Sequence, residues 1–318
     1  MKKTIITIIS IISLILISTI IILSTIGIET KKFNNLISKK INQSNKNIDL
    51  KFDTIKFKLD TKEISLFLET SKPQIIYRSV IIPVKNIKVY IDFISLIKSK
   101  PKIKKINLAL EELDIGQLKK LIITMKPSNF KSLVANNINQ GKLISDIEFY
   151  LDENNLLKNF IARGKVLNLE VKLIDNLIIK KTNLSFFADK TDILIKNIFG
   201  ELDNIKLADG DLRVKLSPEI SLQSNFLSIL NYNVKSSDKH TYFINKFPLA
   251  ENIKNLKAEF NNDLRINFDK TYKVKNYSFN NNGIISEAII KLKDNLKSDL
   301  IEKDINSLSF IDSKISTN

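Results

Sequence analysis

Residues able to carry acid, base or nucleophilic chemistry are scarce in this chain. The only histidine is His240, which lies in a polar segment, 236–241, with no nucleophile motif beside it. The sequence contains no cysteine, so it offers no thiolate nucleophile, no disulfide and no cysteine metal site. It also lacks the HExxH motif of metalloproteases and a glycine-rich phosphate loop. We interpret His240 as a solvated loop residue.

Acidic residues are the remaining candidates for chemistry. They gather near expected strand ends and turns: Glu111-Glu112, Asp152-Glu153, and Asp203, Asp209 and Asp211 around Gly210. Solubility explains acidic pairs at such positions better than acid–base catalysis does. The cluster around Gly210 lacks the ligand pattern of a calcium loop. We therefore expect no catalytic residue, no metal site and no cofactor, and we expect that the protein is not an enzyme.

An apolar run extends from Thr4 to Ile28 without a charged residue and follows Lys2 and Lys3. A helix needs roughly 20 apolar residues to cross the hydrocarbon core of a bilayer, so this run is long enough. The alternative is a cleaved signal peptide, whose apolar part usually has about 7–15 residues and ends in a small-x-small site. Only segment 24–27 resembles such a site. We predict an uncleaved transmembrane anchor over residues 1–30.

Lysines flank this anchor on both sides, so the positive-inside rule alone does not orient it. The short tail before the anchor is easily retained, and no later uncharged apolar run exceeds about ten residues. We therefore predict a single-pass inner-membrane protein with a cytoplasmic N-terminus. The bulk of the chain would lie in the periplasm of a bacterium with two membranes.

The composition is that of a globular protein, with 43% hydrophobic and 26% charged residues among 318. The formal net charge of +16 would suit an anionic membrane surface or nucleic acid. Nucleic-acid-binding proteins, however, usually gather Arg and Lys on one element together with aromatic platforms. The lysines here are spread evenly along the chain, so we expect no nucleic-acid partner.

The segment after the anchor changes its periodicity twice. Helical spacing over 31–46 predicts an amphipathic helix against the membrane face. From Ile48 the period becomes two, which predicts a first β segment over 47–140. Within it, 55–68 is expected to form a hairpin that turns at 60–63. Helical spacing returns between 115 and 138, where we expect one or two short helices interrupted at Pro127.

One apolar run of the first segment, Ile75 to Val84, is interrupted by Arg78 and closed by Pro83. Because proline cannot donate to a ladder, this run is expected to be an edge or bent strand.

A second β segment is predicted over 141–318, with turn signals about every 8–12 residues. Turns are expected at Asp209-Gly210, at 261–263 and at 280–283, where Asn-Gly suits a type I′ turn. Residues 226–230 are compatible with a helical turn.

Apolar residues of the first segment alternate with polar ones, and we expect ten of them to share one face of the sheet. They are Ile55, Phe57, Leu59, Ile64, Leu66, Leu68, Ile87, Val89, Ile91 and Phe93. A continuous apolar face must be covered by helices, by a second sheet or by a ligand. Long helical segments are scarce, so these residues are candidates for the lining of a lipid groove. An ordinary dry sandwich core of the same residues is an almost equal alternative.

The order of anchor, amphipathic helix and alternating hairpins resembles the AsmA-like family of envelope proteins. The residues that carry this resemblance are Gly27-Ile28-Glu29-Thr30, Asn47-Ile48-Asp49-Leu50, Phe57-Lys58-Leu59, the strand 87–92, and the strand–glycine–strand pattern over 193–214. The resemblance implies a mainly β fold with one N-terminal transmembrane helix, in which an elongated, curved antiparallel sheet forms a taco-like groove with a few short helices. The resemblance extends over most of the chain as a general pattern of strands, and it is best in the N-terminal region.

The resemblance also implies a function, which is phospholipid transport between membranes or outer-membrane biogenesis. The expected partners are a phospholipid or other membrane lipid, the inner membrane and an envelope protein. The alternative is an anchored scaffold that binds a protein partner through an edge strand and carries no lipid. An open apolar channel favours transfer, whereas a closed core favours the scaffold.

Overall fold

The computed structural model describes most of the chain between Lys2 and Thr317. The residues that it describes are 2–31, 34–35, 38–39, 47–63, 65–71, 73–92, 95, 102–125, 129–154, 156–173, 177–202, 205–233, 252–298 and 301–317. Ile64, Phe93, Pro127, Asp203 and His240 lie outside these residues. Most of the predicted amphipathic helix over 31–46 also lies outside them. The described residues 34–35 and 38–39 of this segment are helical.

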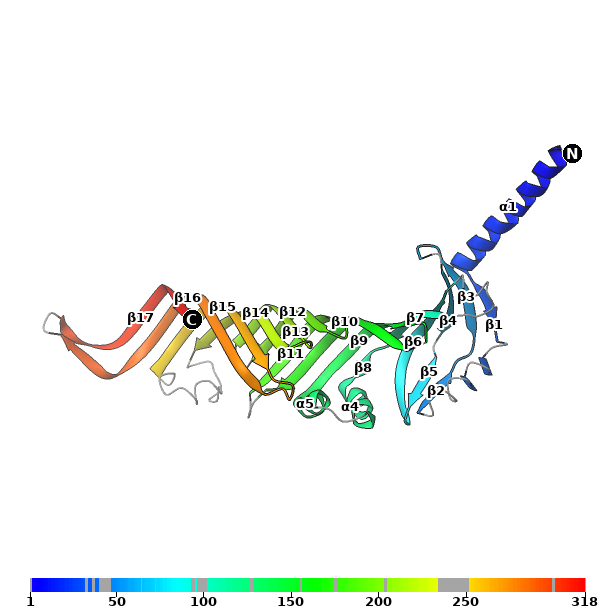
Figure 1. Cartoon of the computed structure of the whole chain (residues 1–318). Helices are drawn as coiled ribbons and strands as arrows, with labels where there is room; N and C mark the ends of the chain where they lie inside the picture. The colour runs from blue at the N-terminus through cyan, green and yellow to red at the C-terminus, as the bar shows by residue number, and fades with distance from the viewer. Residues whose placement is uncertain are drawn as a thin grey trace. The chain divides into compact units, whose positions relative to one another are not determined.

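The protein is mainly β, as the alternation predicts, with one N-terminal apolar helix and an antiparallel sheet of 17 strands that is not closed. The helices are α1 (Lys2–Thr25), α4 (Ile115–Thr124) and α5 (Asn129–Asn137). The strands are β1 (Ile28–Thr30), β2 (Ile48–Lys51), β3 (Ile55–Asp60), β4 (Ser65–Ser71), β5 (Gln74–Tyr77), β6 (Val80–Ile91), β7 (Ile103–Leu110), β8 (Leu113–Asp114), β9 (Ile138–Leu151), β10 (Leu157–Lys172), β11 (Ile178–Ala188), β12 (Asp192–Leu202), β13 (Ile205–Lys215), β14 (Ile220–Asn233), β15 (Ile253–Phe268), β16 (Val274–Ser298) and β17 (Ile301–Thr317). Figure 1 labels these elements along the chain.

The chain divides into two compact units. Unit 1 contains Met1–Leu113 and Ile144–Ala162, and unit 2 contains Asp114–Leu143 and Arg163–Asn318. Each unit is described by itself below.

In unit 1, α1 is long and apolar enough to cross a membrane, with a mean hydropathy of 3.0 over Lys3–Thr25. Its threonines return their hydroxyls to the helix backbone, as Thr7 does to Lys3 O at 2.9 Å and Thr25 to Ile21 O at 2.7 Å. These bonds satisfy the hydroxyl donors without water, so they do not disqualify the helix from an apolar environment. The helix ends at Thr25 and is closed by Gly27, which has a φ of 77° and whose N–H donates to Ile22 O at 2.8 Å.

Strand pairing in unit 1 follows the order β1, β3, β4, β6, β7, β9, and every pair is antiparallel. The short strand β2 pairs with β5, which in turn pairs with the first residues of β6. The predicted hairpin is present as β3 and β4. In its turn, Asp60 Oδ1 accepts the N–H groups of Lys62 and Glu63 at 3.0 and 3.2 Å.

The apolar run predicted as one strand over 75–84 is instead a hairpin of β5 and β6. Arg78 and Ser79 connect the two strands with φ values of 46° and 71°. Positive φ at both central residues is the geometry of a type I′ turn, which matches the twist of the flanking strands. Within β6 the pairing partner changes, since β6 pairs with β5 up to Pro83 and with β4 from Asn86 onward.

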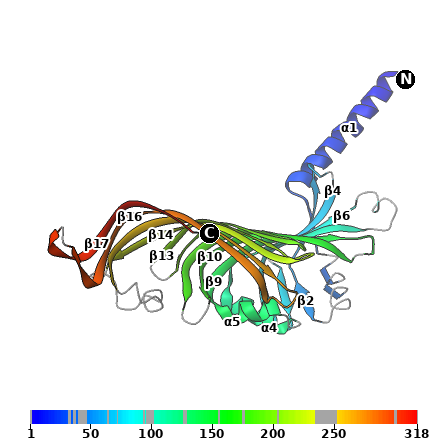
Figure 2. The same ribbon diagram turned by 60° about the vertical axis from the view of Figure 1, so that its left-hand side comes forward.

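In unit 2, the helical spacing after residue 115 gives two helices, α4 and α5, which lie side by side in both views (Figures 1 and 2). Asp114 begins α4 with a capping box, because its carboxylate accepts the Gln117 N–H at 2.9 Å and the Gln117 side chain accepts the Asp114 N–H. Leu121 is the buried residue of this helix, whereas Ile123 is exposed.

The strands of unit 2 are longer than the turn signals predict. The expected turns at 261–263 and 280–283 were wrong, because these residues lie within the continuous strands β15 and β16 and pair with each other. The helical turn suggested for 226–230 was also wrong, since it is part of β14. The chain tolerates Gly283 within a strand because Phe260, its cross-strand partner, packs against it: a Cβ at Gly283 would lie 2.2 Å from the Phe260 ring.

The expected turn at Asp209-Gly210 was wrong as well, because β13 continues through it as a bulge. Asp209 has a φ of 48°, and the register with β14 shifts between Ala208 and Asp211. Positive φ recurs on the three preceding strands, at Asn168, Lys181 and Asn197. We call these four residues the bulge row. Register shifts accompany three of these residues, Lys181, Asn197 and Asp209. A bulge bends its strand and increases the local twist, so these three change the course of β11, β12 and β13.

Candidate functional site: an apolar pocket in unit 1

One face of the unit 1 sheet carries three rows of directly opposed residues, which we call the apolar rows. Row A contains Ile28, Phe57, Leu68, Val89, Ile106 and Phe149; row B contains Thr30, Ile55, Thr70, Ile87, Leu108 and Ile147; row C contains Leu59, Leu66, Ile91 and Ile103. Directly opposed residues of antiparallel strands project their side chains from the same face. Alternation within each strand thus gives a face on which all residues of the three rows are apolar except Thr30 and Thr70.

Rows A and B meet a second wall that is formed by β2 and β5. Two hydrogen bonds connect the described residues after β1 to this wall. Ser38 Oγ donates to Leu50 O of β2 at 2.7 Å, and Asn34 Nδ2 donates to Asp53 O, just after β2, at 2.6 Å. Leu50 is buried and belongs to the same core cluster as Val84 and Ile87.

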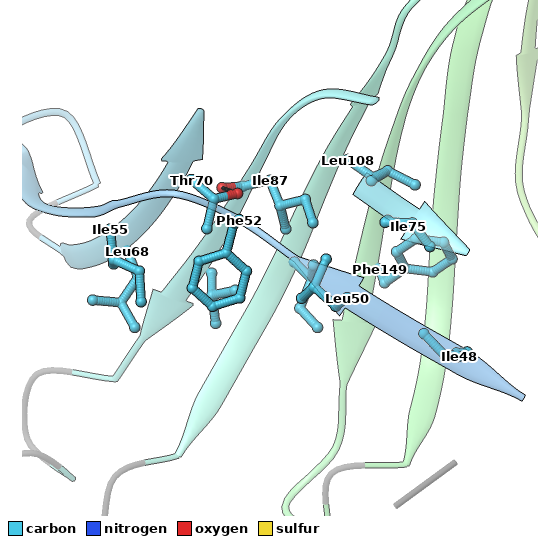
Figure 3. A pocket seen from close by; sticks show the side chains of 12 residues that line it. Ile48, Leu50, Phe52, Ile55, Leu68, Thr70, Ile75, Ile87, Leu108 and Phe149 are labelled. Carbon is cyan, nitrogen blue, oxygen red and sulfur yellow. Dashed lines mark hydrogen bonds between the residues drawn. The ribbon is translucent and has the colours of Figure 1, made fainter. Parts of the chain in front are cut away.

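A pocket of about 310 Å³ lies between these walls. Its lining consists of eleven apolar residues and one threonine: Ile48, Leu50, Phe52, Ile55, Leu68, Thr70, Ile75, Ile87, Val89, Ile106, Leu108 and Phe149. Figure 3 shows these side chains gathered around β2 and the neighbouring strands. A pocket without charged or strongly polar lining can take hydrocarbon, but it offers no acid, base or nucleophile.

The predicted groove residues are only partly brought together in this pocket. Ile55, Leu68, Ile87 and Val89 line it. The remaining described members of the prediction share the same face but lie in rows A and C outside the lining: Phe57, Leu59, Leu66 and Ile91. Ile64 and Phe93 lie outside the described residues.

The sequence prediction missed the residues of β2, β5, β7 and β9 that complete the lining. The signal was present, because Ile48, Leu50 and Phe52 alternate with polar residues, as do Ile106 and Leu108. Alternation alone does not reveal that β2 lies near the apolar rows, because its position depends on its pairing with β5.

The opposite face of the same strands is charged and aromatic. Glu69 forms ion pairs with Lys58 at 2.9 Å and with Lys88 at 3.7 Å. Phe67 and Tyr90 stack with their ring centroids 5.1 Å apart, and Lys105 Nζ lies 4.4 Å from the centre of the Tyr90 ring. These contacts stabilise cross-strand neighbours and give the sheet one polar and one apolar side.

Tyr90 is the one residue of this polar face with a strongly shifted pKa. Burial raises its pKa to about 12, and the carboxylates of Asp60 and Glu63 add to the shift because they disfavour a nearby phenolate. Lys105, which lies over the ring, also donates to Glu63 at 2.6 Å. The phenol therefore stays neutral at physiological pH and acts as a packing residue.

Two of the acidic candidates of the sequence, Asp152 and Asp209, have structural roles. Asp152 Oδ1 accepts the N–H groups of Asn154 and Leu156, both at 2.9 Å, and so closes the turn after β9. Asp209 belongs to the bulge row. Among the described residues, no group of three His, Asp or Glu side chains is arranged to hold a metal ion.

Unit 2 has an apolar face of its own, with a polar side chain at its centre. On β15, Leu256, Ala258, Phe260, Leu264 and Ile266 alternate with polar residues, and Asn262 takes the middle position of this apolar series. Asn262 is only 6% exposed. Its Nδ2, which has two hydrogens to donate, lies 3.0–3.1 Å from three acceptors, Phe226 O, Ser228 Oγ and Phe260 O, and its Oδ1 accepts from Asn281 Nδ2 at 2.8 Å.

Compared with known proteins, the chain matches no protein family, no curated protein and no solved structure. Its function is therefore inferred from its own residues.

Proposed function

We propose that this protein is a membrane-anchored lipid-binding protein that holds acyl chains in the pocket of unit 1 and along the apolar rows. The observation that carries the proposal is the pocket itself, which has about 310 Å³ of space and a single polar side chain in its lining. Each buried methylene of an acyl chain contributes about 0.8 kcal/mol to binding. An apolar chain is therefore the ligand best matched to this lining.

The position of the apolar rows relative to α1 supports a lipid ligand. Ile28 follows the end of α1 by three residues and is the first member of row A, opposite Phe57. Gly27 permits this close approach, since a Cβ there would lie 2.7 Å from both Phe57 O and the Lys58 side chain. If α1 spans a bilayer, the apolar rows begin where acyl chains are available.

The proposed setting is the inner membrane of a bacterium with two membranes, with the N-terminus in the cytoplasm and both units in the periplasm. The proposed role is phospholipid transport between the membranes or outer-membrane biogenesis, which the resemblance to the AsmA-like family implies. The alternating hairpins and the apolar anchor support it.

Photo-crosslinking in cells tests the proposal directly. A crosslinking amino acid is placed in the full-length chain at Val89, which lines the pocket, or at the adjacent Lys88, which lies on the polar face. We expect phospholipid adducts at position 89 and none at position 88. Protein adducts without lipid at position 89 would overturn the proposal.

A second candidate is the anchored scaffold, and one observation in unit 2 favours it. Ile284 and Ile311 are 46% and 71% exposed, although their register partners on β17 and β16 are Lys314 and Glu287. Apolar side chains exposed on a polar face can contact a protein partner. Crosslinks from position 311 to a protein, together with lipid-free position 89, would favour the scaffold over lipid binding.

A further inference from the structure

The pocket has two ends, and a charged lipid headgroup must lie outside one of them, because the apolar lining offers it no partner. Figure 3 shows Ile48 at one end of the lining and Ile55 and Leu68 at the other. Ile55 is directly opposite Thr30, which follows the end of α1 by five residues. A tail directed toward the anchor therefore places the headgroup at the Ile48 end.

The turn between β5 and β6 lies just beyond the Ile48 end. Ile48 is directly opposite Tyr77, so the Tyr77 side chain projects from the same face of this wall as the lining residues Ile48 and Ile75. The Arg78 guanidinium lies over the Tyr77 ring, with its Cζ 5.7 Å from the ring centroid. Its Nε also donates to Asn47 Oδ1 at 3.2 Å. A positive charge is thus held next to the apolar end of the pocket.

The backbone of this turn does not favour an arginine. Arg78 and Ser79 have φ values of 46° and 71°, which glycine, asparagine and aspartate adopt more readily. Arg78 is exposed, so packing in a core does not account for it either. Residues held in such conformations cluster at ligand-binding sites, where the side chain contributes to binding.

We propose that Arg78 binds the phosphate of a phospholipid whose acyl chain occupies the pocket. This inference rests on the proposed function and names its ligand class, which is lipid with a phosphate in the headgroup. A guanidinium presents its N–H donors in a planar fork that fits phosphate oxygens. The contacts with Tyr77 and Asn47 orient this fork before the lipid binds, which lowers the entropic cost of binding.

The test compares two lipids that differ only by the phosphate group. Full-length protein in detergent micelles is titrated with phosphatidic acid or with diacylglycerol of the same acyl chains, and bound lipid is measured by mass spectrometry of the purified complex. We expect phosphatidic acid to bind about tenfold more tightly, as one charge-assisted hydrogen bond would provide. Arg78→Asn should bring the ratio to about one and leave diacylglycerol binding unchanged. This variant suits the turn, because asparagine adopts positive φ readily.

Lys51→Gln is the matched control. Lys51 follows Leu50 on β2, so it projects from the opposite face of the same wall, and its side chain is 66% exposed. It removes one positive charge, as Arg78→Asn does, but should leave the tenfold ratio unchanged. Loss of the ratio in both variants would indicate attraction by net charge and overturn the proposal.

Inorganic phosphate distinguishes the two sources of this group. Added at the concentration of the lipid, it should not displace phosphatidic acid, because it has no tail in the pocket. Complete displacement would assign the site to free phosphate and overturn the lipid headgroup as its ligand.

The remaining outcomes separate this inference from the function on which it rests. Equal binding of both lipids by the unsubstituted protein overturns the role of Arg78 but leaves acyl-chain binding intact. A tenfold ratio that persists in Arg78→Asn, or in Arg78→Gln as a second variant, overturns it as well. Absence of binding for both lipids overturns the proposed function itself.

Discussion

The two units place a polar side chain in an apolar face in opposite ways. In unit 2, Asn262 is buried and has four hydrogen-bonding groups within 2.8–3.1 Å, so both its amide nitrogen and its amide oxygen are bonded within the fold. In unit 1, Thr70 is nearly as buried but has one bond at 3.5 Å and borders a pocket. A buried polar group with complete bonding holds the strands in register, whereas a single long hydrogen bond contributes little to that register. The difference separates an apolar face that is crossed by its own polar network from one that borders a pocket.

Removing the Asn262 side chain should have the largest effect. Asn262→Ala leaves Ser228 and Asn281 without their buried partner, and we expect the free energy of unfolding to fall by about 3 kcal/mol. Urea unfolding of the full-length protein in detergent measures it. Asn267→Ala is the matched control, because Asn267 is on the same strand but exposed and binds only Asn276. Similar midpoints for the two variants would show that the network of unit 2 is not structural.

The polar face of unit 1 should respond to alkaline pH through Tyr90. Its folded pKa of about 12 lies above the ordinary value of 10.0, so the unfolded chain loses this proton first. The stabilisation is complete below pH 10 and is lost as the pH rises toward 12. We expect a loss of about 1 to 2 kcal/mol, because screening by solvent reduces the effect of the neighbouring carboxylates.

Thermal unfolding between pH 8 and 12 measures this loss, and Tyr90→Phe should reduce it. Tyr277→Phe is the control, since Tyr277 is 74% exposed. An identical alkaline loss in the Tyr90→Phe and unsubstituted proteins would contradict this account.

The smallest effect on stability is expected at Thr70. Thr70→Val removes only a long hydrogen bond and preserves shape, so the free energy of unfolding should change by less than about 0.5 kcal/mol. Urea midpoints of the ligand-free full-length protein measure it. A loss comparable to that of Asn262→Ala would place Thr70 among the structural residues and remove the contrast between the units.

The sequence predicts the local parts of this fold, but it does not predict the parts whose structure depends on contacts between strands. The hairpin of β3 and β4 was predictable, because alternation and the Asp60 turn are both local signals. The course of β15 and β16 was not, since asparagine and glycine normally indicate turns. Here Asn262 is satisfied by residues of β14 and β16, and Gly283 is covered by Phe260. The pocket was half predictable for the same reason: its face follows from alternation, whereas its second wall depends on the pairing of β2 with β5.

The bulge row has a consequence for how this chain can change by insertion and deletion. On β12, the residues opposed to apolar positions of β13 are Ile193 and Ile195 before Asn197 but Gly200 and Leu202 after it. The extra residue thus changes which residues of β12 face the apolar side of the sheet, from odd-numbered ones before the bulge to even-numbered ones after it. Deleting Asn197 would move the side chains of one half of β12 to the opposite face of the sheet, and a one-residue insertion elsewhere in the strand would do the same. The bulged strands can therefore change length by two residues more easily than by one.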